Sequence, residues 1–190
     1  MQNIDNNSWR GKYISLRGFS MDDIDRHFKF GRHYDSESER LRGHLRLPLP
    51  PEKVREVVSA RLEKQGQSDD FWWIIEDHRE NIVGNIRSFD CCPQPGTFSY
   101  GIFIEKKYWN RGYASEALIL VCRFYFEELR YQKLTTIVNS FNERSILFHQ
   151  RFGFVEEGRL RRMQFSKGLY YDHIYFGLLG EEFTALYPSK

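Results

Sequence analysis

The sequence has little of what marks several common protein classes. No apolar run approaches the roughly 18 residues that cross a bilayer. The opening stretch MQNIDNNSWR has neither the charged start nor the apolar middle of a signal peptide. The chain also contains no GxxxxGKS/T and no GxGxxG motif, which argues against a nucleotide triphosphatase or a dinucleotide oxidoreductase. A cytoplasmic protein without membrane contact is therefore expected.

Neither charge of one sign nor cysteine is present in excess. Lys and Arg total 28 against 26 for Asp and Glu, so the net charge of +2 gives no general attraction to nucleic acid or anionic membrane. The three cysteines, Cys91, Cys92 and Cys122, fit a reducing compartment and free thiols. A strained bond between the adjacent pair is the less favoured alternative. We expect no nucleic-acid partner and no metal site.

What the chain does contain is the composition of a folded domain. Hydrophobic residues make up 41% and aromatic residues 16%. A length of 190 residues usually holds one hydrophobic core, so the sequence predicts a single domain over residues 1–190. Its core should be rich in Phe and Tyr.

Hydrophobic spacing predicts an α/β fold, with one mixed sheet covered by helices. The expected strands are 12–19, 71–76, 82–89, 98–104, 134–138 and two within 154–178 around an SKG turn at 166–168. The first expected helix starts after Ser20 and ends near Gly31 to Tyr34. Three further helices are expected at 51 to about 65, at 113–129 and at 144–152, and Gly153 closes the last of them. A turn at 77–81 and a loop at 90–97 should make the middle strands an antiparallel meander. Because a helix crosses from 98–104 to 134–138, those two strands should be parallel.

The segment YWNRGYASEA, residues 108–117, places a glycine directly before a long apolar helix. A helix start exposes several N–H groups and the positive end of the helix dipole. Gly112 would let an anion approach this backbone closely, and Arg111 adds a positive charge suited to phosphate oxygens. An ordinary helix start with a turn glycine explains this segment alone equally well.

Together with the order of elements, IFIEKKYWNRGYASEAL and NERSILFHQRFGFVEEGRLR resemble the GNAT superfamily of acetyl-CoA-dependent N-acetyltransferases. The resemblance covers nearly the whole chain and is strongest to the ribosomal-protein N-acetyltransferase branch, which also contains polyamine acetyltransferases. The superfamily's phosphate loop reads Gln/Arg-x-x-Gly-x-Gly/Ala. WNRGYA matches it at Gly112 and Ala114 but has Trp109 in the first position.

A second motif of the superfamily is Asn-x-x-Ser, with Gly-Phe eleven residues after the Asn. It is found here at Asn142, Ser145, Gly153 and Phe154. The resemblance implies a mostly antiparallel sheet with a splayed parallel strand pair. Asn142 would bind the cofactor arm or brace the loop beside it, and a role as helix N-cap is an alternative that can coexist.

By the same resemblance, the cosubstrate is acetyl-CoA. Its pyrophosphate would lie on the backbone amides of Asn110, Arg111, Gly112, Tyr113, Ala114 and Ser115. The strand that ends in Phe103 and Ile104 would pair with the pantetheine arm. Gly101 fits an opening between two strands, since glycine often marks a close backbone approach.

Acetyl transfer from a thioester to an amine needs a neutral amine, a polarised carbonyl and a protonated leaving thiolate. His149 stands where many superfamily members have the Tyr that protonates the thiolate, and histidine can donate a proton near neutral pH. An inert side chain on a helix face is the alternative. No base is carried over by motif, since Ser99 replaces an acid that the branch often has. The remaining candidates are Glu76, Glu105, Asp172, which could instead fix a turn or strand edge, and His173.

The acceptor amine is expected between the early helices and the C-terminal strands. The loop there carries Arg32, His33, Arg40, Arg42, His44 and Arg46 against Asp35, Glu37 and Glu39. This charge favours a protein N-terminus or a small amine with a neutral or acidic part over a polyamine. A non-catalytic acyl-CoA sensor or interaction module is the competing interpretation. The sequence leaves open whether the protein is a monomer or a homodimer.

Overall fold

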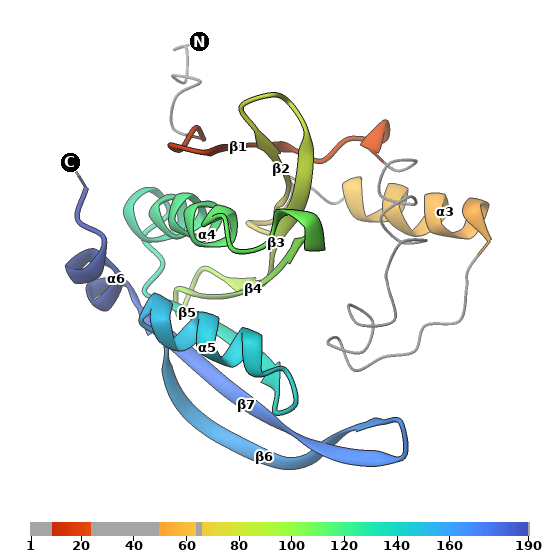
Figure 1. The fold of residues 1–190 in the computed structure, drawn as a ribbon. Helices are drawn as coiled ribbons and strands as arrows, with labels where there is room; N and C mark the ends of the chain where they lie inside the picture. The colour runs from red at the N-terminus through yellow and green to blue at the C-terminus, as the bar shows by residue number, and fades with distance from the viewer. Residues whose placement is uncertain (1–8, 24–49, 64–65, 190) are drawn as a thin grey trace. The chain divides into compact units, whose positions relative to one another are not determined.

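The computed structural model describes residues 9–23, 50–63 and 66–189. The chain divides into two compact units, whose helices and strands are labelled in Figure 1. The first comprises Met1–Phe19, Gln65–Leu134 and Leu179–Lys190, and the second Ser20–Lys64 and Thr135–Leu178. A single domain over residues 1–190 stays a prediction.

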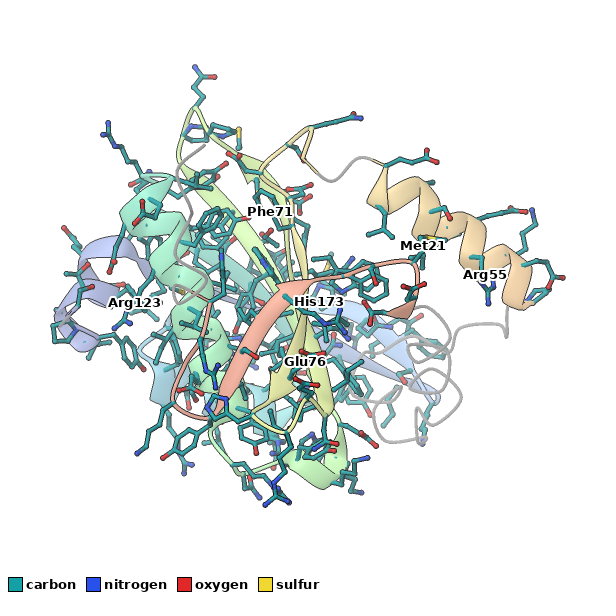
Figure 2. All side chains as sticks on the ribbon, turned by 90° about the horizontal axis from the view of Figure 1, so that it is seen from above. Met21, Arg55, Phe71, Glu76, Arg123 and His173 are labelled. Carbon is teal, nitrogen blue, oxygen red and sulfur yellow. The ribbon has the colours of Figure 1, made fainter. Side chains whose placement is uncertain are left out.

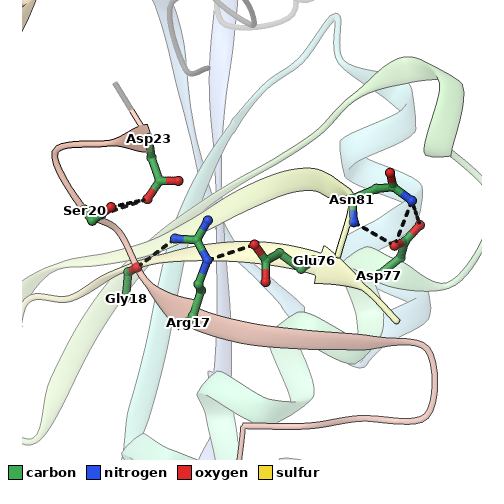
Figure 3. Close-up of polar contacts among 7 residues, drawn as sticks. All are labelled: Arg17, Gly18, Ser20, Asp23, Glu76, Asp77 and Asn81. Carbon is green, nitrogen blue, oxygen red and sulfur yellow. Dashed lines mark hydrogen bonds and ion pairs between the residues drawn. The ribbon is translucent and has the colours of Figure 1, made fainter. Parts of the chain in front are cut away.

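An antiparallel meander of four strands forms the basis of the first unit. The strands are β1 (Ile14–Gly18), β2 (Trp72–Asp77), β3 (Ile82–Cys92) and β4 (Thr97–Ile104). At the predicted turn 77–81, Oδ1 of Asp77 accepts the backbone N–H of Asn81 at 2.9 Å (Figure 3). Across β1 and β2, Nε of Arg17 donates to Oε1 of Glu76 at 2.8 Å (Figure 3). The predicted meander is confirmed.

The loop expected at 90–97 is shorter than predicted. β3 continues through Cys92 and its pairing with β4 shifts register between Phe89 and Cys92. Asp90 takes a positive φ of 53° inside this irregularity, a conformation that Asp tolerates better than most residues. The strand therefore contains a bulge at this point. The Pro and Gly residues in the same stretch of sequence had indicated a loop instead.

The predicted helix 113–129 is present but is not uniform. In the sequence, the polar residues Glu116, Arg123, Glu127 and Arg130 recur at helical spacing and form a single polar stripe. α4 (Tyr113–Arg123) accordingly buries its apolar face and is followed by a π-helical turn, η2 (Phe124–Glu128). The hydroxyl of Tyr125, inside this turn, donates to the carbonyl oxygen of Asp69 and lies 2.6 Å from Oγ of Ser88. Groups distant in sequence thus hold the wider turn, and helical periodicity cannot reveal them.

Aromatic rings fill much of the first unit's core. Phe71, labelled in Figure 2, has its ring 5.5 Å from that of Trp73 and 5.8 Å from that of Phe124. Phe98 stacks on Tyr125 with 4.0 Å between ring centres. Each such pair contributes about 0.5–1.5 kcal/mol beyond its buried area. The expected Phe- and Tyr-rich core is confirmed.

A short helix near the C-terminus was not predicted. α6 (Gly180–Leu186) begins with glycine, and Oε2 of Glu182 accepts the backbone N–H of Leu179 at 2.8 Å to close its first turn. Phe183 is fully buried, with its ring 5.5 Å from Phe126. Seven residues with one buried anchor are too few to show a helical period.

The second unit contains α3 (Pro51–Leu62), β5 (Lys133–Asn139, whose first residues belong to the first unit), α5 (Glu143–Phe152), β6 (Val155–Ser166) and β7 (Leu169–Leu179). Pro51 starts α3 as predicted, and Gly153 closes α5 with a φ of 107°. Lys167 and Gly168, both with positive φ, turn β6 into β7. These elements confirm the predicted helices and the hairpin turn.

The structure describes the start of the first predicted helix but not its body. The carboxylate of Asp23 accepts both the backbone N–H and the hydroxyl of Ser20, each at 2.9 Å (Figure 3). Such a contact is typical of a helix N-terminus. The helix expected through Gly31 to Tyr34, and the charged loop with Arg32 to Arg46, lie outside the described residues.

The seven strands follow the order β1-β2-β3-β4-β5-β7-β6. The sheet is mostly antiparallel with one parallel pair and is flanked by helices, which confirms the predicted fold class. None of the helices in residues 9–23, 50–63 and 66–189 combines the length and the apolar character that a membrane crossing requires.

Candidate active site

A tryptophan closes the turn that leaves β4. The indole Nε1 of Trp109 donates to the carbonyl oxygen of Ile104 at 2.7 Å, across a 3-10 helix, η1 (Lys106–Tyr108). The backbone N–H of Glu105 donates to the carbonyl of Val83 on β3 at 2.9 Å. Trp109 therefore has a structural contact at the position where the resembled superfamily has Gln or Arg.

The start of α4 is open. Gly112 has a φ of +80°, and a Cβ built on it would meet no atom within 4 Å. The first helical hydrogen bond joins the N–H of Glu116 to the carbonyl of Gly112 at 3.0 Å, and no side chain of the described residues caps this end. The amides of Tyr113, Ala114 and Ser115 thus precede the helical ladder and face no cap. Such amides beside open space suit a diphosphate, so the loop fits coenzyme A.

Arg111 lies beside this opening. Its guanidinium carbon is 5.5 Å from the centre of the Tyr108 ring. Both side chains line a cavity of about 480 Å³, together with Tyr13, Tyr113 and the β2–β3 turn. Arg111 is exposed and so can place a positive charge near a bound anion.

Sequence reasoning missed Glu116, which anchors the first turn of α4. Its Oε2 accepts the backbone N–H of Tyr13 at 2.8 Å and of Ile14 at 2.9 Å, and its Oε1 accepts that of Lys12. Three successive amides at the start of β1 thus converge on one carboxylate. The signal in the sequence, a Glu in the polar stripe of a helix, is the same as for a solvated residue.

The end of β4 is held against β3 by a close backbone contact. A Cβ at Gly84 would overlap the carbonyl oxygen of Phe103, so this position needs glycine. At Gly101 a Cβ would lie 3.6 Å from the Phe89 ring, an ordinary contact. Of these two glycines on β3 and β4, Gly84 is the one that packing requires, and the sequence did not single it out. Phe103 and Ile104 are half-buried at the end of the strand.

Asn142 caps α5. Its Oδ1 accepts the backbone N–H of Ser145 at 3.1 Å, and its own N–H donates to Asn139 at 2.8 Å. This confirms the N-cap interpretation and explains the Asn-x-x-Ser spacing. A contact of Asn142 with the cofactor stays a prediction.

His149 is buried on α5, with 4% of its surface exposed. Its ring stacks on Phe176 at 5.5 Å and meets the edge of Phe154 at 5.0 Å. Nδ1 lies 2.6 Å from the carbonyl oxygen of Ser145, to which it donates. Burial lowers the pKa of His149 from 6.5 to about 4, although the bond to Ser145 opposes this shift. These surroundings favour a neutral side chain that packs α5 over a proton donor.

The three candidate carboxylate bases all have partners. Glu76 pairs with Arg17 at 2.8 Å and Glu105 with Lys107 at 3.1 Å. Oδ1 of Asp172 accepts the backbone N–H of Arg162 at 3.0 Å. This contact holds the edge strand β6, in agreement with the expectation that Asp172 could fix a turn or strand edge. His173, the fourth candidate, is half-buried on β7.

Eight of the predicted cofactor-binding residues lie within one segment of the first unit, residues 103–115. Phe103 and Ile104 end β4, and Asn110, Arg111, Gly112, Tyr113, Ala114 and Ser115 form the turn into α4. Asn142 and His149 belong to α5 in the second unit. A mixed sheet whose fourth strand leads into an open, glycine-preceded helix is the arrangement that the resemblance to acetyl-CoA-dependent N-acetyltransferases implied.

Comparison with known proteins specifies the family. A model of the acetyltransferase (GNAT) domain matches residues 14–155. The chain is 41% identical over 175 residues to the SPbeta prophage-derived uncharacterized N-acetyltransferase YokL of Bacillus subtilis strain 168, covering 92% of this chain and 94% of that protein. The chain therefore belongs to the GNAT acetyltransferase family. It is an acyltransferase that uses acetyl-CoA and an amine acceptor.

Two further similarities are less extensive. YdaF of the same organism, provisionally named a ribosomal N-acetyltransferase, is 30% identical over 85 residues, or 45% of this chain and 46% of that protein. The structure of spermidine N-acetyltransferase from Vibrio cholerae in complex with CoA and spermine has a TM-score of 0.78 at 17% identity, covering 91% and 99% of the two chains. At this identity the likeness shows the fold alone.

Proposed function

We propose that the enzyme transfers the acetyl group to a primary amine by direct attack on the thioester. The acceptor is a protein N-terminus or a small amine with a neutral or acidic part. The observation that carries the proposal is the open start of α4, where Gly112 faces empty space and no described side chain caps the amides. Acetyl-CoA supplies an activated acetyl group as a thioester.

Each part of the segment has a distinct role in binding. The amides of residues 110–115 hold the pyrophosphate, and the positive end of α4 adds to their attraction. The exposed guanidinium of Arg111 contributes charge from the side. The backbone of Phe103 and Ile104, which Trp109 fixes through Ile104, pairs with the pantetheine arm.

Direct attack is supported by the state of the cysteines. Burial raises the pKa of Cys91 to about 12 and that of Cys122 well above its usual value, so neither is a thiolate at neutral pH. Cys92 is exposed but pairs with Thr97, at the opposite end of β4 from Ile104. Seven steps along the strand separate Thr97 from Ile104 by roughly 23 Å at about 3.3 Å per step. A covalent acyl-cysteine is therefore not part of the proposed reaction.

The burial of His149 favours a role in the packing of α5 over a role as the proton donor to the thiolate. A donor with a pKa of about 4 would be almost entirely deprotonated at neutral pH. We assign His149 to packing of α5 and leave protonation of the thiolate to another group or to water. The variant His149→Phe should then retain turnover.

The names of relatives point to different acceptors. YdaF carries a ribosomal name, whereas the Vibrio cholerae structure is a spermidine enzyme. Residues 32–46 carry more basic than acidic side chains, and this excess of positive charge would repel a polycation. This charge supports a peptide N-terminus or a neutral or acidic small amine over spermidine.

Release of free thiol from acetyl-CoA across an amine panel tests the proposal. The panel holds peptides with free N-termini, spermidine and aminoglycosides, and thermal stabilisation by acetyl-CoA reports binding separately. We expect stabilisation, turnover with a peptide or small amine, and acetylated product by mass spectrometry. Preference for spermidine would contradict the acceptor assignment. An acetylated enzyme that forms without acceptor and is lost in Cys91→Ser or Cys92→Ser would contradict direct attack.

A further inference from the structure

A cavity of about 480 Å³ lies beside the open start of α4 and belongs entirely to the first unit. Its walls come from the start of β1, the β2–β3 turn and the turn that leads into α4. Arg111 and Tyr113, the two neighbours of Gly112, both line it. Sites for small molecules have volumes of about 300–1,000 Å³. The cavity therefore adjoins the helix start and is large enough for a further part of a ligand that is bound there.

Three tyrosine rings give this space, the tyrosine cavity, its aromatic walls. They belong to Tyr13, Tyr108 and Tyr113. The rings of Tyr108 and Tyr113 have their centres 6.4 Å apart, and 46% of the surface of Tyr13 is exposed. Every nucleobase has a flat π-face that stacks on aromatic side chains. These walls thus suit a flat aromatic base.

Two arginines and one acid also line the tyrosine cavity. Arg79 and Arg111 are both exposed, and the guanidinium carbon of Arg111 lies 5.5 Å from the centre of the Tyr108 ring. Asp77 binds within its own turn, where Oδ1 accepts the backbone N–H of Arg79 at 2.9 Å. Both of its oxygens also accept hydrogen bonds from Asn81 (Figure 3). Positive charge therefore predominates, and guanidinium groups suit phosphate oxygens.

Hydrogen bonds between distant segments hold the walls of the cavity in place. Nε2 of His78, in the β2–β3 turn, donates to the carbonyl oxygen of Lys12 at 2.8 Å. The backbone N–H of Tyr13 donates to Oε2 of Glu116 on α4, also at 2.8 Å. The start of β1 is thus tied to the β2–β3 turn and to α4. A site whose walls are fixed in advance loses less affinity to ordering when its ligand binds.

We propose that the tyrosine cavity binds an adenosine that carries phosphate groups, with the base against the tyrosine rings and a 3′-phosphate on Arg79. Coenzyme A ends in an adenosine of this kind, joined to the pyrophosphate that we assign to the adjoining amides. The assignment to the cofactor thus rests on the proposed function. A free adenosine phosphate has the same chemistry and is the second source. For both sources Arg79 determines specificity, because it selects nucleotides that carry the 3′-phosphate.

Adenosine 3′,5′-bisphosphate tests the site itself. We expect isothermal titration calorimetry to show one site on the wild-type protein. The affinity should be about tenfold lower in Arg79→Ala, which loses a charge-assisted hydrogen bond to phosphate. Arg10→Ala removes an exposed arginine of the same unit that does not line the cavity, so this matched control should bind as the wild type does.

CoA and dephospho-CoA, which lacks the 3′-phosphate, distinguish the two sources. If the cavity holds the end of the cofactor, the bisphosphate competes with CoA. CoA should then bind about tenfold more tightly than dephospho-CoA to the wild-type protein, and equally tightly to Arg79→Ala. Tyr108→Leu should weaken both cofactors and keep their ratio, since both carry the same base. If the cavity takes a free nucleotide, the bisphosphate binds alongside CoA and the two cofactors bind equally.

Two results would overturn the nucleotide site. The wild-type protein could fail to bind the bisphosphate at millimolar concentration. Alternatively, Arg79→Ala could bind it as tightly as the wild type while circular dichroism shows that the variant is folded. Failure of the proposed function has a different signature, in which the bisphosphate binds with the expected dependence on Arg79 but CoA neither binds nor stabilises the protein.

Discussion

The carboxylate of Glu116, in the first turn of α4, accepts the backbone N–H of Ile14 at the start of β1, at 2.9 Å. The neighbouring amides of Lys12 and Tyr13 bind the same group. An acid in the first turn also stabilises a helix through its dipole. Because the carboxylate is occupied by these amides, it ties β1 to the helix start that we assign to the pyrophosphate.

Glu116→Gln should show this positioning role. The substitution keeps the side-chain shape but removes a charged acceptor, so we expect the free energy of unfolding to fall by about 2 kcal/mol in urea titrations. CoA affinity, measured by calorimetry, should also fall. Loss of negative charge alone would raise affinity for an anion, so tighter binding would contradict the role. Glu128→Gln, exposed on η2, is the control and should change neither quantity.

Gly112→Val should block the approach of the diphosphate. The left-handed φ of +80° costs a non-glycine residue about 1–2 kcal/mol of stability. The new methyl groups occupy the open space, so the dissociation constant for CoA should rise about tenfold or more. Gly168→Val, at a φ of +81° and equally open, carries the same strain in the β6–β7 turn. Equal CoA affinity in the two folded variants would remove the loop from the site.

Gly84→Ala should destabilise the sheet far more than Gly101→Ala. A Cβ at position 84 would overlap the carbonyl oxygen of Phe103, and backbone atoms cannot yield as a side chain does. We expect a loss of about 1–3 kcal/mol at Gly84 and little change at Gly101. Chemical denaturation of both variants measures the difference. Similarly small losses of unfolding free energy at the two positions would show that β3 and β4 can move apart to admit a methyl group.

His149 should make the protein less stable in acid. Burial lowers the pKa of His149 from 6.5 to about 4. The neutral ring therefore contributes its full stability at pH values above 6.5, the pKa that histidine has in the unfolded chain. That contribution is lost as the pH falls through about 4, and amounts to at most about 3 kcal/mol. His149→Phe should therefore flatten the fall in unfolding free energy between about pH 7 and about pH 4. A parallel fall in the variant would show that other groups cause it.

Turnover of His149→Phe is a separate readout. If the ring packs α5, the rate of acetyl transfer at neutral pH should stay within about threefold of wild type, well below the 10²–10⁴-fold that a general acid contributes. Loss of turnover with unchanged CoA affinity would restore the proton-donor role that the superfamily resemblance implies.

The amino-acid sequence by itself determined the order of the predicted strands and helices and the glycine-containing turn that precedes α4. Alternating strands, the turn at Asp77 to Asn81 and the glycine before α4 are local features, because each depends on residues within one turn or strand. The spacing of Asn142 and Ser145 likewise encodes a cap that the structure contains. These patterns were sufficient to predict the mixed sheet and the open helix start.

Tertiary structure decided what each side chain at these positions does. Glu116 and Glu127 belong to the same polar stripe, yet the first binds amides about a hundred residues away while the second is exposed. His149 has the sequence position of an acid but lies among Phe154 and Phe176, which lower its pKa by excluding water. Contacts between distant segments set burial and hydrogen bonding, and local sequence patterns carry no record of them.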